Sequence, residues 1–326
     1  MSPFKALVIR EKGSPATLET LEPGDLPDGD VLVSVQYSSL NYKDGLAITQ
    51  TSPVIRKFPM VPGVDLVGTV VESTSSTFQP GQTVIATGWE MGERYWGGYS
   101  QMAKVQADWL IPLPDRLTGV EAMAIGTAGL TAMLSIMALE AHGISSDRPI
   151  LVTGAAGGVG SIAIALLSRL GYPVTASSGR HEIIGDYLHD LGATDVIGRL
   201  EPLQPALGSQ QWSGAIDTVG GQTLATLLKT ITYGGCVANC GLAGGSNLPT
   251  TVFPFILRNV SLLGIDSVLC PQEKRLQAWQ RLTELLTDDL FELILNAIIP
   301  LDHVPTFSKQ ILAGQVQGRV VVDCNG

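Results

Sequence analysis

The chain of 326 residues has few cysteines, few charged residues and a shortage of basic ones. Its 4 cysteines form no C-x-x-C pair, so neither a disulfide framework nor a cysteine zinc knuckle is expected. The 20 Lys and Arg are outnumbered by 30 Asp and Glu, which gives a formal net charge of −10. Because nucleic-acid binding needs a basic surface, this balance argues against nucleic acid as a partner.

Long apolar runs and targeting signals are also missing. No stretch reaches the roughly 20 apolar residues of a membrane span, and the most apolar helical candidate, 162–170, is too short. The first ten residues read as a strand without the apolar region of a signal peptide. We therefore expect a cytoplasmic protein that does not enter a membrane. The 4 histidines are scattered, so no metal site is expected.

The order of predicted elements indicates two domains, as the length does at about 150 residues per domain. Short strands between Pro-Gly turns suggest a β-rich, barrel-like or sandwich module in the first third. These strands are expected at 4–9, 30–37, 66–72 and 83–86. A helix follows at 120–142, with Gly126 and Gly129 as points of close packing.

From residue 149 onward, apolar runs alternate with helical segments, which predicts βαβ units and a parallel sheet. The expected strands are 150–153, 174–177, 196–197, 214–217, 236–240 and 261–265, and the expected helices are 158–170, 183–191 and 223–231. An amphipathic helix at 273–287 and a final strand at 318–323 complete the chain.

The most informative segment is the glycine-rich turn between strand 150–153 and helix 158–170. Read as G-x-G-x-x-G, its frame is AAGGVG at 155–160, so an alanine replaces the first glycine. The second glycine lets the backbone approach a pyrophosphate, the third lets the helix pack on the strand, and the helix start favours an anion. A tight turn without a ligand is the alternative. The predicted cofactor contacts here are Ala156, Gly157, Gly158, Val159 and Gly160.

The next strand indicates which nucleotide binds. It ends in Ser177, Ser178, Gly179 and Arg180, without the acidic residue that usually binds the ribose 2′-hydroxyl of NAD. The serines offer hydroxyls, the glycine allows close backbone approach, and Arg180 offers a guanidinium to a 2′-phosphate. We therefore favour NADPH over NADH. A polar loop with a solvated arginine is the alternative.

Together these motifs resemble the medium-chain dehydrogenase/reductase superfamily over nearly the whole chain. More narrowly, the chain is similar to the YhdH/YhfP family of quinone oxidoreductase-like proteins, which includes NADPH-dependent acrylyl-CoA reductases. The resemblance implies an α/β protein with a GroES-like β-rich catalytic domain at 1–123, completed by 293–326. A Rossmann doubly wound parallel-sheet domain that binds NADP would then span 124–292. The resemblance rests on SSLNYKD at 38–44, PMVPGVD at 59–65, GTAGLTA at 126–132, the turn at 153–160, SGR at 178–180, AIDTVG at 215–220, YGGCVANCGLAGG at 233–245, FPFILR at 253–258 and GIDSV at 264–268.

The residues with which zinc-dependent relatives bind metal are missing. Those relatives carry a cysteine where Asn41 stands, Gly-His-Glu where residues 63–65 read GVD, and a four-cysteine loop after the equivalent of Val105. A catalytic zinc needs three protein ligands. The resemblance therefore implies a zinc-independent reaction.

The resemblance places the segment NYKD at 41–44 in the active-site cleft. Reduction of an activated C=C bond takes a hydride at the β-carbon, hydrogen-bond donors for the developing enolate and a proton for the α-carbon. Tyr42 is the candidate acid, and Asn41, Lys43 and Asp44 are its candidate helpers. Alternatively, Asn41 and Asp44 only cap the following helix, and Tyr42 packs over the nicotinamide.

Further cofactor contacts are implied beside the nicotinamide and at strand ends, where ligands bind in doubly wound sheets. Arg319 would close over the cofactor from the last strand, or is a surface charge. Packing between helices and a plain sheet strand are the alternatives for the helix and strand positions. The other residues of this set are Thr127, Thr131, Thr218, Cys240, Gly241, Leu262, Ile265 and Ser267.

Three functions remain open. The favoured one is NADPH-dependent reduction of acrylyl-CoA to propionyl-CoA. An NADPH:quinone reductase is the enzymatic alternative, and an NADPH-binding sensor or structural protein with little turnover belongs to another class. The family further implies a homodimer through the edge strand at 261–268. The aromatic loop 89–99 forms either a wall of the substrate cleft or a hairpin against the barrel.

Overall fold

The computed structural model describes residues 2–326, which form two compact units. Unit 1 comprises Met1–Thr127, Ser267–Thr283 and Leu295–Gly326, and unit 2 comprises Ala128–Asp266 and Glu284–Ile294. The units are nested, in the order that the motifs indicate. The expected cofactor domain at 124–292 differs in three places, because residues 293–294 belong to unit 2, whereas residues 124–127 and Ser267–Thr283 belong to unit 1. Helix α7 (Gln272–Leu285) is held there by Arg275, which is buried and donates to the Thr87 carbonyl at 2.7 Å.

Unit 1 is built on a seven-stranded sheet with the order β14-β15-β3-β4-β5-β7, and β6 also pairs with β3. Every second residue of β3 from Val31 to Val35 is fully buried, as the period of a strand dictates. The strands are β3 (Val31–Leu40), β4 (Asp65–Ser73), β5 (Thr83–Thr87), β6 (Met102–Val105), β7 (Leu110–Pro112), β14 (Leu295–Pro300) and β15 (Arg319–Asp323). The hairpin of β1 (Phe4–Val8) and β2 (Thr17–Leu21) forms a separate sheet.

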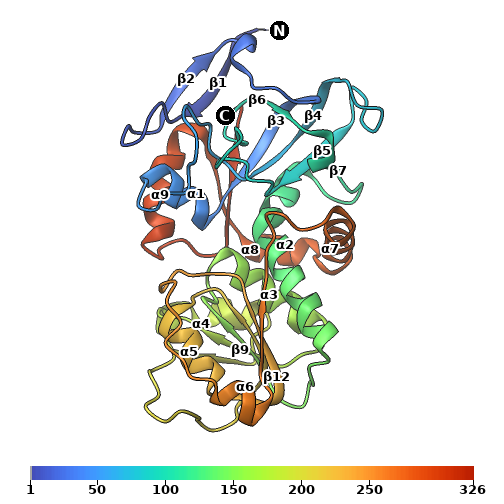
Figure 1. The fold of residues 1–326 in the computed structure, drawn as a ribbon. Helices are drawn as coiled ribbons and strands as arrows, with labels where there is room; N and C mark the ends of the chain where they lie inside the picture. Colours follow the sequence, from blue (N-terminus) through green and yellow to red (C-terminus); the bar gives the residue numbers. More distant parts are fainter. Residues whose placement is uncertain (1) are drawn as a thin grey trace. The chain divides into compact units, whose positions relative to one another are not determined.

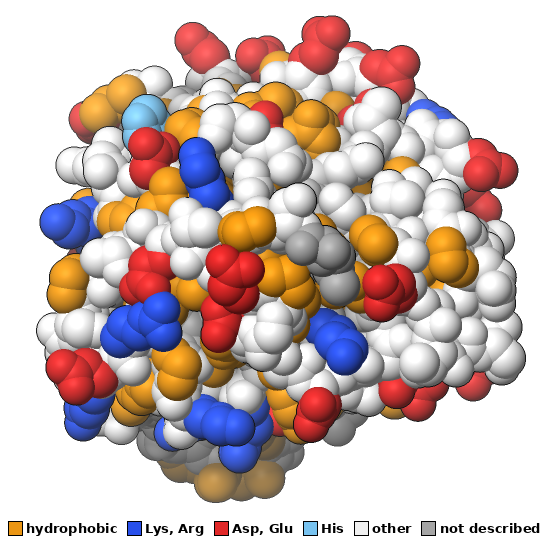
Figure 2. Space-filling model, turned by 90° about the horizontal axis from the view of Figure 1, so that it is seen from above, with side chains coloured by type: hydrophobic (Ala, Val, Ile, Leu, Met, Phe, Trp, Pro, Cys, Tyr) orange, Lys and Arg blue, Asp and Glu red, His pale blue; other side chains and the backbone are white. Residues whose placement is uncertain are grey.

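Two helices of unit 1 lie side by side, although the chain separates them by more than 250 residues. They are α1 (Tyr42–Thr49) and α9 (Val304–Leu312) (Figure 1). Short 3-10 turns lie at Pro23–Asp25, Ala107–Trp109 and Leu301–His303. On the face of the molecule in Figure 2, Lys and Arg side chains are interspersed with Asp and Glu and form no basic patch.

Unit 2 contains a six-stranded parallel sheet with the order β10-β9-β8-β11-β12-β13. Numbered within the unit, this is 3-2-1-4-5-6, the order of a doubly wound dinucleotide-binding fold. The strands are β8 (Ile150–Thr153), β9 (Val174–Ser177), β10 (Asp195–Ile197), β11 (Trp212–Asp217), β12 (Ile231–Asn239) and β13 (Ser261–Gly264). The helices are α3 (Gly158–Arg169), α4 (His181–Asp190), α5 (Gly221–Leu228), α6 (Phe253–Arg258) and α8 (Asp288–Ile294). The predicted α/β fold class is confirmed.

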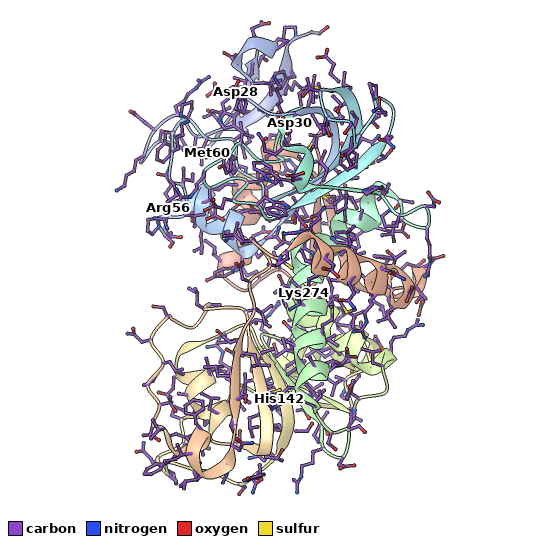
Figure 3. The ribbon with its side chains drawn as sticks, turned by 45° about the vertical axis from the view of Figure 1, so that its right-hand side comes forward. Asp28, Asp30, Arg56, Met60, His142 and Lys274 are labelled. Carbon is purple, nitrogen blue, oxygen red and sulfur yellow. The ribbon has the colours of Figure 1, made fainter. Side chains whose placement is uncertain are left out.

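Helix α2 (Gly119–His142) runs through the boundary between the units and is broken at Gly126, whose φ is 47° and ψ −153°. Its far end is tied to unit 2, because His142 Nε2 lies 3.1 Å from the Gly234 carbonyl oxygen (His142 is labelled in Figure 3). The apolar length of this helix is greater than the sequence pattern indicated. By length and composition alone, the helix is apolar enough to cross a membrane. However, 83% of its most apolar window is buried inside the protein, as in the core helix of a soluble protein.

The elements that sequence patterns missed are short ones that depend on tertiary contacts: β2, β6, β7, β14, α6, α8 and α9. The boundary between α5 and β12 was also wrong. The helix expected at 223–231 ends at Leu228, because Ile231 already pairs with Trp212 as the first residue of β12.

Candidate active site

Three charged side chains are buried together beside the segment that carries Tyr42. Asp44, Asp65 and Arg319 expose 1%, 0% and 2% of their surface, and all three belong to unit 1. A buried charge is costly unless it is paired and hydrogen-bonded. The cluster was not predicted as a unit, because only Asp44 and Arg319 were singled out, each for a different role.

Asp65 is the acceptor at the centre of this cluster. Its Oδ2 accepts from Ser39 Oγ at 2.5 Å, from Asn41 Nδ2 at 2.9 Å and from the Thr127 amide at 2.9 Å. Its Oδ1 accepts from Thr127 Oγ1 at 2.5 Å. The predicted cofactor residue Thr127 is therefore bound to Asp65 through both its amide and its hydroxyl.

Arg319 is buried, so the surface charge considered for it is wrong. Its guanidinium donates to the carbonyls of Ala124 (2.8 Å) and Leu40 (3.2 Å) and to Ser39 Oγ (3.0 Å). Burial lowers the pKa of this guanidinium, and the nearby carboxylates of Asp65 and Asp44 oppose that shift. The contact with the cofactor stays a prediction.

Asn41 and Asp44 cap helix α1, which was the alternative to a catalytic role. The Asn41 amide donates to Asp44 Oδ2 at 3.0 Å, and the two residues form a capping box. The Asn41 Nδ2 group is committed to Asp44, Asp65 and Ser39. Asn41 therefore has no free donor for a substrate, and its predicted role as a catalytic donor is corrected to a positioning one.

Tyr42 and Lys43 are the two side chains of this segment that reach the surface. Tyr42 is 37% exposed. The ammonium of Lys43 lies 2.6 Å from the carboxylate of Glu93 in the aromatic loop. This loop is packed on unit 1, where Trp96 Nε1 donates to the Pro59 carbonyl at 3.0 Å. Lys43 therefore has a fixed partner, and Tyr42 remains the candidate proton donor of the segment.

Burial and the neighbouring Asp65 carboxylate raise the pKa of Asp44 from 3.8 to about 7, which links the cluster to pH. The buried Tyr99 and Arg319 also face it. Between these two pKa values the folded chain holds a proton that the unfolded chain has released, so stability falls as pH rises through this range. At about 1.4 kcal/mol per pKa unit, the total is on the order of a few kcal/mol.

We expect the free energy of unfolding to fall between about pH 4 and pH 7, and Asp44→Asn to flatten this slope. Urea unfolding at each pH measures it. Asp30→Asn is the matched control, since among residues 2–326 the Asp30 carboxylate accepts only from the Ala107 amide at 3.3 Å. Equal slopes in Asp44→Asn and the parent would contradict the assignment.

Gly126 lies directly against the cluster. An ideal Cβ at this position would be 2.6 Å from Asp65 Oδ2 and 2.9 Å from Ser39 Oγ. Its φ and ψ also belong to a region that is essentially restricted to glycine. The close-packing role predicted for Gly126 therefore has a specific cause, which is the approach of the α2 backbone to buried polar atoms.

We expect Gly126→Ala to lower the free energy of unfolding by about 2–4 kcal/mol, through backbone strain and the clash with Asp65. Gly143→Ala is the control, because Gly143 also has a positive φ (82°) but nothing within 4 Å of its ideal Cβ. The control should lose only about 1 kcal/mol. Equal losses, compared by thermal and urea unfolding, would show that the cluster does not require glycine.

In unit 2, the glycine-rich turn has the geometry of an anion-binding helix start. Gly154 has a φ of 59°, and a Cβ at Gly160 would collide with the Gly154 carbonyl oxygen. Helix α3 begins at Gly158 without a side-chain cap. Within residues 2–326, the amides of Gly158, Val159 and Gly160 have no hydrogen-bond acceptor. Such unpaired amides at a helix start bind phosphate oxygens.

The ends of three neighbouring strands meet at Asp217, which sequence reasoning did not single out. Its carboxylate accepts from Thr153 Oγ1 (2.6 Å), Asn239 Nδ2 (2.8 Å) and the Gly220 amide (2.8 Å). A Cβ on Gly241 would overlap the carbonyl of Thr218, so the ends of β11 and β12 are in direct contact. Asp217 thereby organises the edge of the sheet on which Thr218 and Gly241 were predicted.

The residues predicted to bind a 2′-phosphate lie at the end of β9. Arg199, which the sequence analysis did not single out, lies beside them. The Arg180 amide donates to Ser178 Oγ at 3.2 Å, while Ser177 Oγ donates to the Gly198 carbonyl. An ideal Cβ at Gly179 would lie 2.5 Å from Arg199 Nε, so this exposed arginine lies over the turn. Its distance of 20 residues from Gly179 hid it, because only the parallel pairing of β9 with β10 brings the strand ends together.

The other predicted contacts are divided between the units. Cys240 and Leu262 are partly buried in unit 2, where burial raises the pKa of the Cys240 thiol to about 12. Thr131 is buried in α2, and the Ile265 amide donates to the Asn239 carbonyl at 3.0 Å. Ser267 is buried in unit 1, where its carbonyl accepts from Arg275.

Comparison with known proteins places these two units in one superfamily. Residues 27–115 match the alcohol dehydrogenase GroES-like domain, and residues 158–287 match the zinc-binding dehydrogenase family. Acrylyl-CoA reductase AcuI of Ruegeria pomeroyi is 51% identical, over 99% of both chains.

Two solved structures are also similar over almost their full length. YhdH of E. coli K-12 with bound NADPH has a TM-score of 0.95 and 51% identity, over 98% of this chain and 100% of the other. YhfP of Bacillus subtilis with bound NAD has a TM-score of 0.93 and 46% identity, over 99% and 100%. The chain belongs to the medium-chain dehydrogenase/reductase superfamily and, within it, to the family of these YhdH, YhfP and acrylyl-CoA reductase proteins.

Proposed function

We propose that this protein is an NADPH-dependent reductase of an activated C=C bond, with acrylyl-CoA as substrate and propionyl-CoA as product. The observation that carries the proposal is the open anion site at the start of α3, with Arg180 and Arg199 at the end of the neighbouring strand. The 51% identity to an acrylyl-CoA reductase supports the choice of substrate.

The chemistry of the unit 2 residues fits NADPH. The amides of residues 158–160 would bind the pyrophosphate, since each points from the helix start without an acceptor. Ser178, Arg180 and Arg199 would surround the 2′-phosphate, to which a guanidinium offers two parallel hydrogen bonds. Bound NADPH supplies the hydride for the β-carbon of the substrate.

In unit 1, Tyr42 is the residue we assign to the proton. Its phenol carries an O–H group, which can donate a hydrogen bond to a developing enolate or a proton to the α-carbon. The other members of the turn hold its backbone. Asn41 and Asp44 close the capping box, and Lys43 is anchored by Glu93.

Steady-state oxidation of NADPH tests the proposal, with acrylyl-CoA and a simple quinone as alternative acceptors. We expect turnover with acrylyl-CoA and a much lower kcat/KM with the quinone. The reverse order would favour a quinone reductase, the class to which YhfP is assigned by its name. Tight NADPH binding without turnover of either compound would indicate a sensor or structural protein.

The zinc-independence of the reaction is part of this proposal. Where zinc-dependent relatives have a cysteine, this chain has Asn41, whose amide is bonded to Asp44 and Asp65. Across residues 2–326, no group of three or more His, Cys, Asp and Glu side chains is arranged to hold a metal ion. Metal analysis of the active protein should find no stoichiometric zinc.

We also propose a cytoplasmic homodimer. The four cysteines are free thiols, as a reducing compartment maintains them. Strand β13 is an edge of the unit 2 sheet, and α6 before it exposes 67% of Ile256 and 57% of Leu257. A second copy pairing along β13 would cover both the open edge and these side chains. Light scattering at twice the chain mass of 34.4 kDa would support it.

A further inference from the structure

The chain immediately before Tyr42 is fixed by two buried charges. Ser39 Oγ donates to Asp65 Oδ2 at 2.5 Å, and Asn41 Nδ2 donates to the same oxygen at 2.9 Å. The Val64 amide, next to Asp65, donates to Asp44 on the other side of Tyr42 at 3.1 Å. Asp65 and its neighbour thus hold both flanks of the exposed tyrosine.

Arg319 completes the same attachment from the last strand. It donates to the carbonyl of Leu40 at 3.2 Å and to Ser39 Oγ at 3.0 Å. Its Nε donates to the Ala124 carbonyl at 2.8 Å and its Nη2 to the Met123 carbonyl at 3.5 Å. Each of the three residues that precede Tyr42 is therefore bound to Asp65, to Arg319 or to both.

At the break in helix α2, the positive charge of Arg319 and the negative charge of Asp65 each lie at a helix end of opposite polarity. The segment before Gly126 ends in carbonyls, the negative end of a helix, and Arg319 binds them. The segment after it begins with the Thr127 amide, at a positive end, and Asp65 binds this amide at 2.9 Å. Swapping or neutralising either charge would leave helix-end groups and a buried ion without their partner.

We propose that Asp65 and Arg319 are a positioning pair, which fixes Tyr42 on unit 1 by binding the three residues that precede it and both ends of the break in α2. Neither side chain is exposed to a substrate, so the pair acts only through the groups that it holds. Rigid support of this kind keeps a reacting group within the narrow range that catalysis requires. The kinetic consequences rest on the function proposed for Tyr42.

The test compares Asp65→Asn and Arg319→Lys in the full-length protein, with 3-fluorotyrosine at position 42. The ¹⁹F NMR signal of this residue reports its surroundings whether or not the protein turns over substrate. We expect one line in the parent, and a shifted or broadened line in both variants. We also expect kcat with acrylyl-CoA to fall by about 10²-fold, with the NADPH dissociation constant changed less than twofold.

Two control variants test whether the loss of any charge that binds the backbone has the same effect, since Arg258 is half-buried and Asp30 is exposed. Arg258→Lys removes a guanidinium that binds the carbonyls of Lys229 and Gly208 in unit 2. Asp30→Asn removes a carboxylate of unit 1 that accepts from the Ala107 amide at 3.3 Å. Both controls should keep the parent ¹⁹F line and the parent kcat.

Four outcomes decide the proposal. An unchanged ¹⁹F line in folded Asp65→Asn and Arg319→Lys overturns it, as does an equal change in the controls. If circular dichroism shows that both variants are unfolded, Ser39→Ala takes their place, and an unchanged line then overturns it as well. A moved line in a protein that does not reduce acrylyl-CoA supports the pair and rejects the proposed reaction.

Discussion

Tyr42→Phe is expected to lower kcat for acrylyl-CoA reduction by about 10²- to 10⁴-fold, the range that general acid catalysis contributes. The phenyl ring preserves the shape and the exposed edge of the residue, while the hydroxyl is lost. KM and the NADPH dissociation constant should change little, because the side chain acts on charge that develops in the transition state.

Steady-state kinetics in H₂O and D₂O measure this effect. If Tyr42 supplies the proton, the solvent isotope effect of the parent should be lost or altered in the variant. Tyr233→Phe is the matched control, because Tyr233 is a tyrosine of unit 2 with 71% of its surface exposed. A loss of less than about threefold in kcat for Tyr42→Phe would remove the residue from the proton transfer and leave it as a packing group beside the cofactor.

The double replacement Arg180→Ala/Arg199→Ala should weaken NADPH binding by about 10²- to 10⁴-fold. A hydrogen bond to a charged group contributes about 1.5–3 kcal/mol, and each factor of ten corresponds to about 1.4 kcal/mol. NADH lacks the 2′-phosphate, so its dissociation constant should stay within about threefold of the parent value. The preference for NADPH over NADH would then be lost.

Titration of the intrinsic fluorescence with each nucleotide measures both constants. Arg169→Ala is the control, because Arg169 is an arginine of unit 2 that binds Thr287 and Asp289 at the far end of α3. The two single variants show how the arginines share the phosphate. If the double variant binds NADPH and NADH more weakly by the same factor, the arginines support the fold of the loop and do not bind the 2′-phosphate.

Much of unit 2 was predictable because its signals are local. The strand β8, the glycine turn and helix α3 are contiguous, and each follows from apolar periodicity and the conformational freedom of glycine. The alternation of strands and helices then predicts the parallel sheet. Arg180 was predicted as a 2′-phosphate contact for the same reason, since it directly follows the second strand.

The contacts that hold the chain beside Tyr42 could not be predicted from local sequence signals. Asp65 and Arg319 are 254 residues apart, and their partners include the backbone carbonyls of residues 40, 123 and 124. Backbone groups carry no sequence signal. The same holds for Asn41, which looked like a catalytic donor until its amide was found to be fully committed.

The sequence by itself determined the nested order of two domains, the doubly wound class of the second and the nucleotide turn, because these depend on residues that are neighbours along the chain. Only the tertiary structure decided that Arg199 faces Gly179, that Asp217 organises the strand ends, and that Arg319 is buried and binds Ser39 and Leu40. These roles depend on which strands pair and which charges are buried together, and burial is a property of the folded chain as a whole.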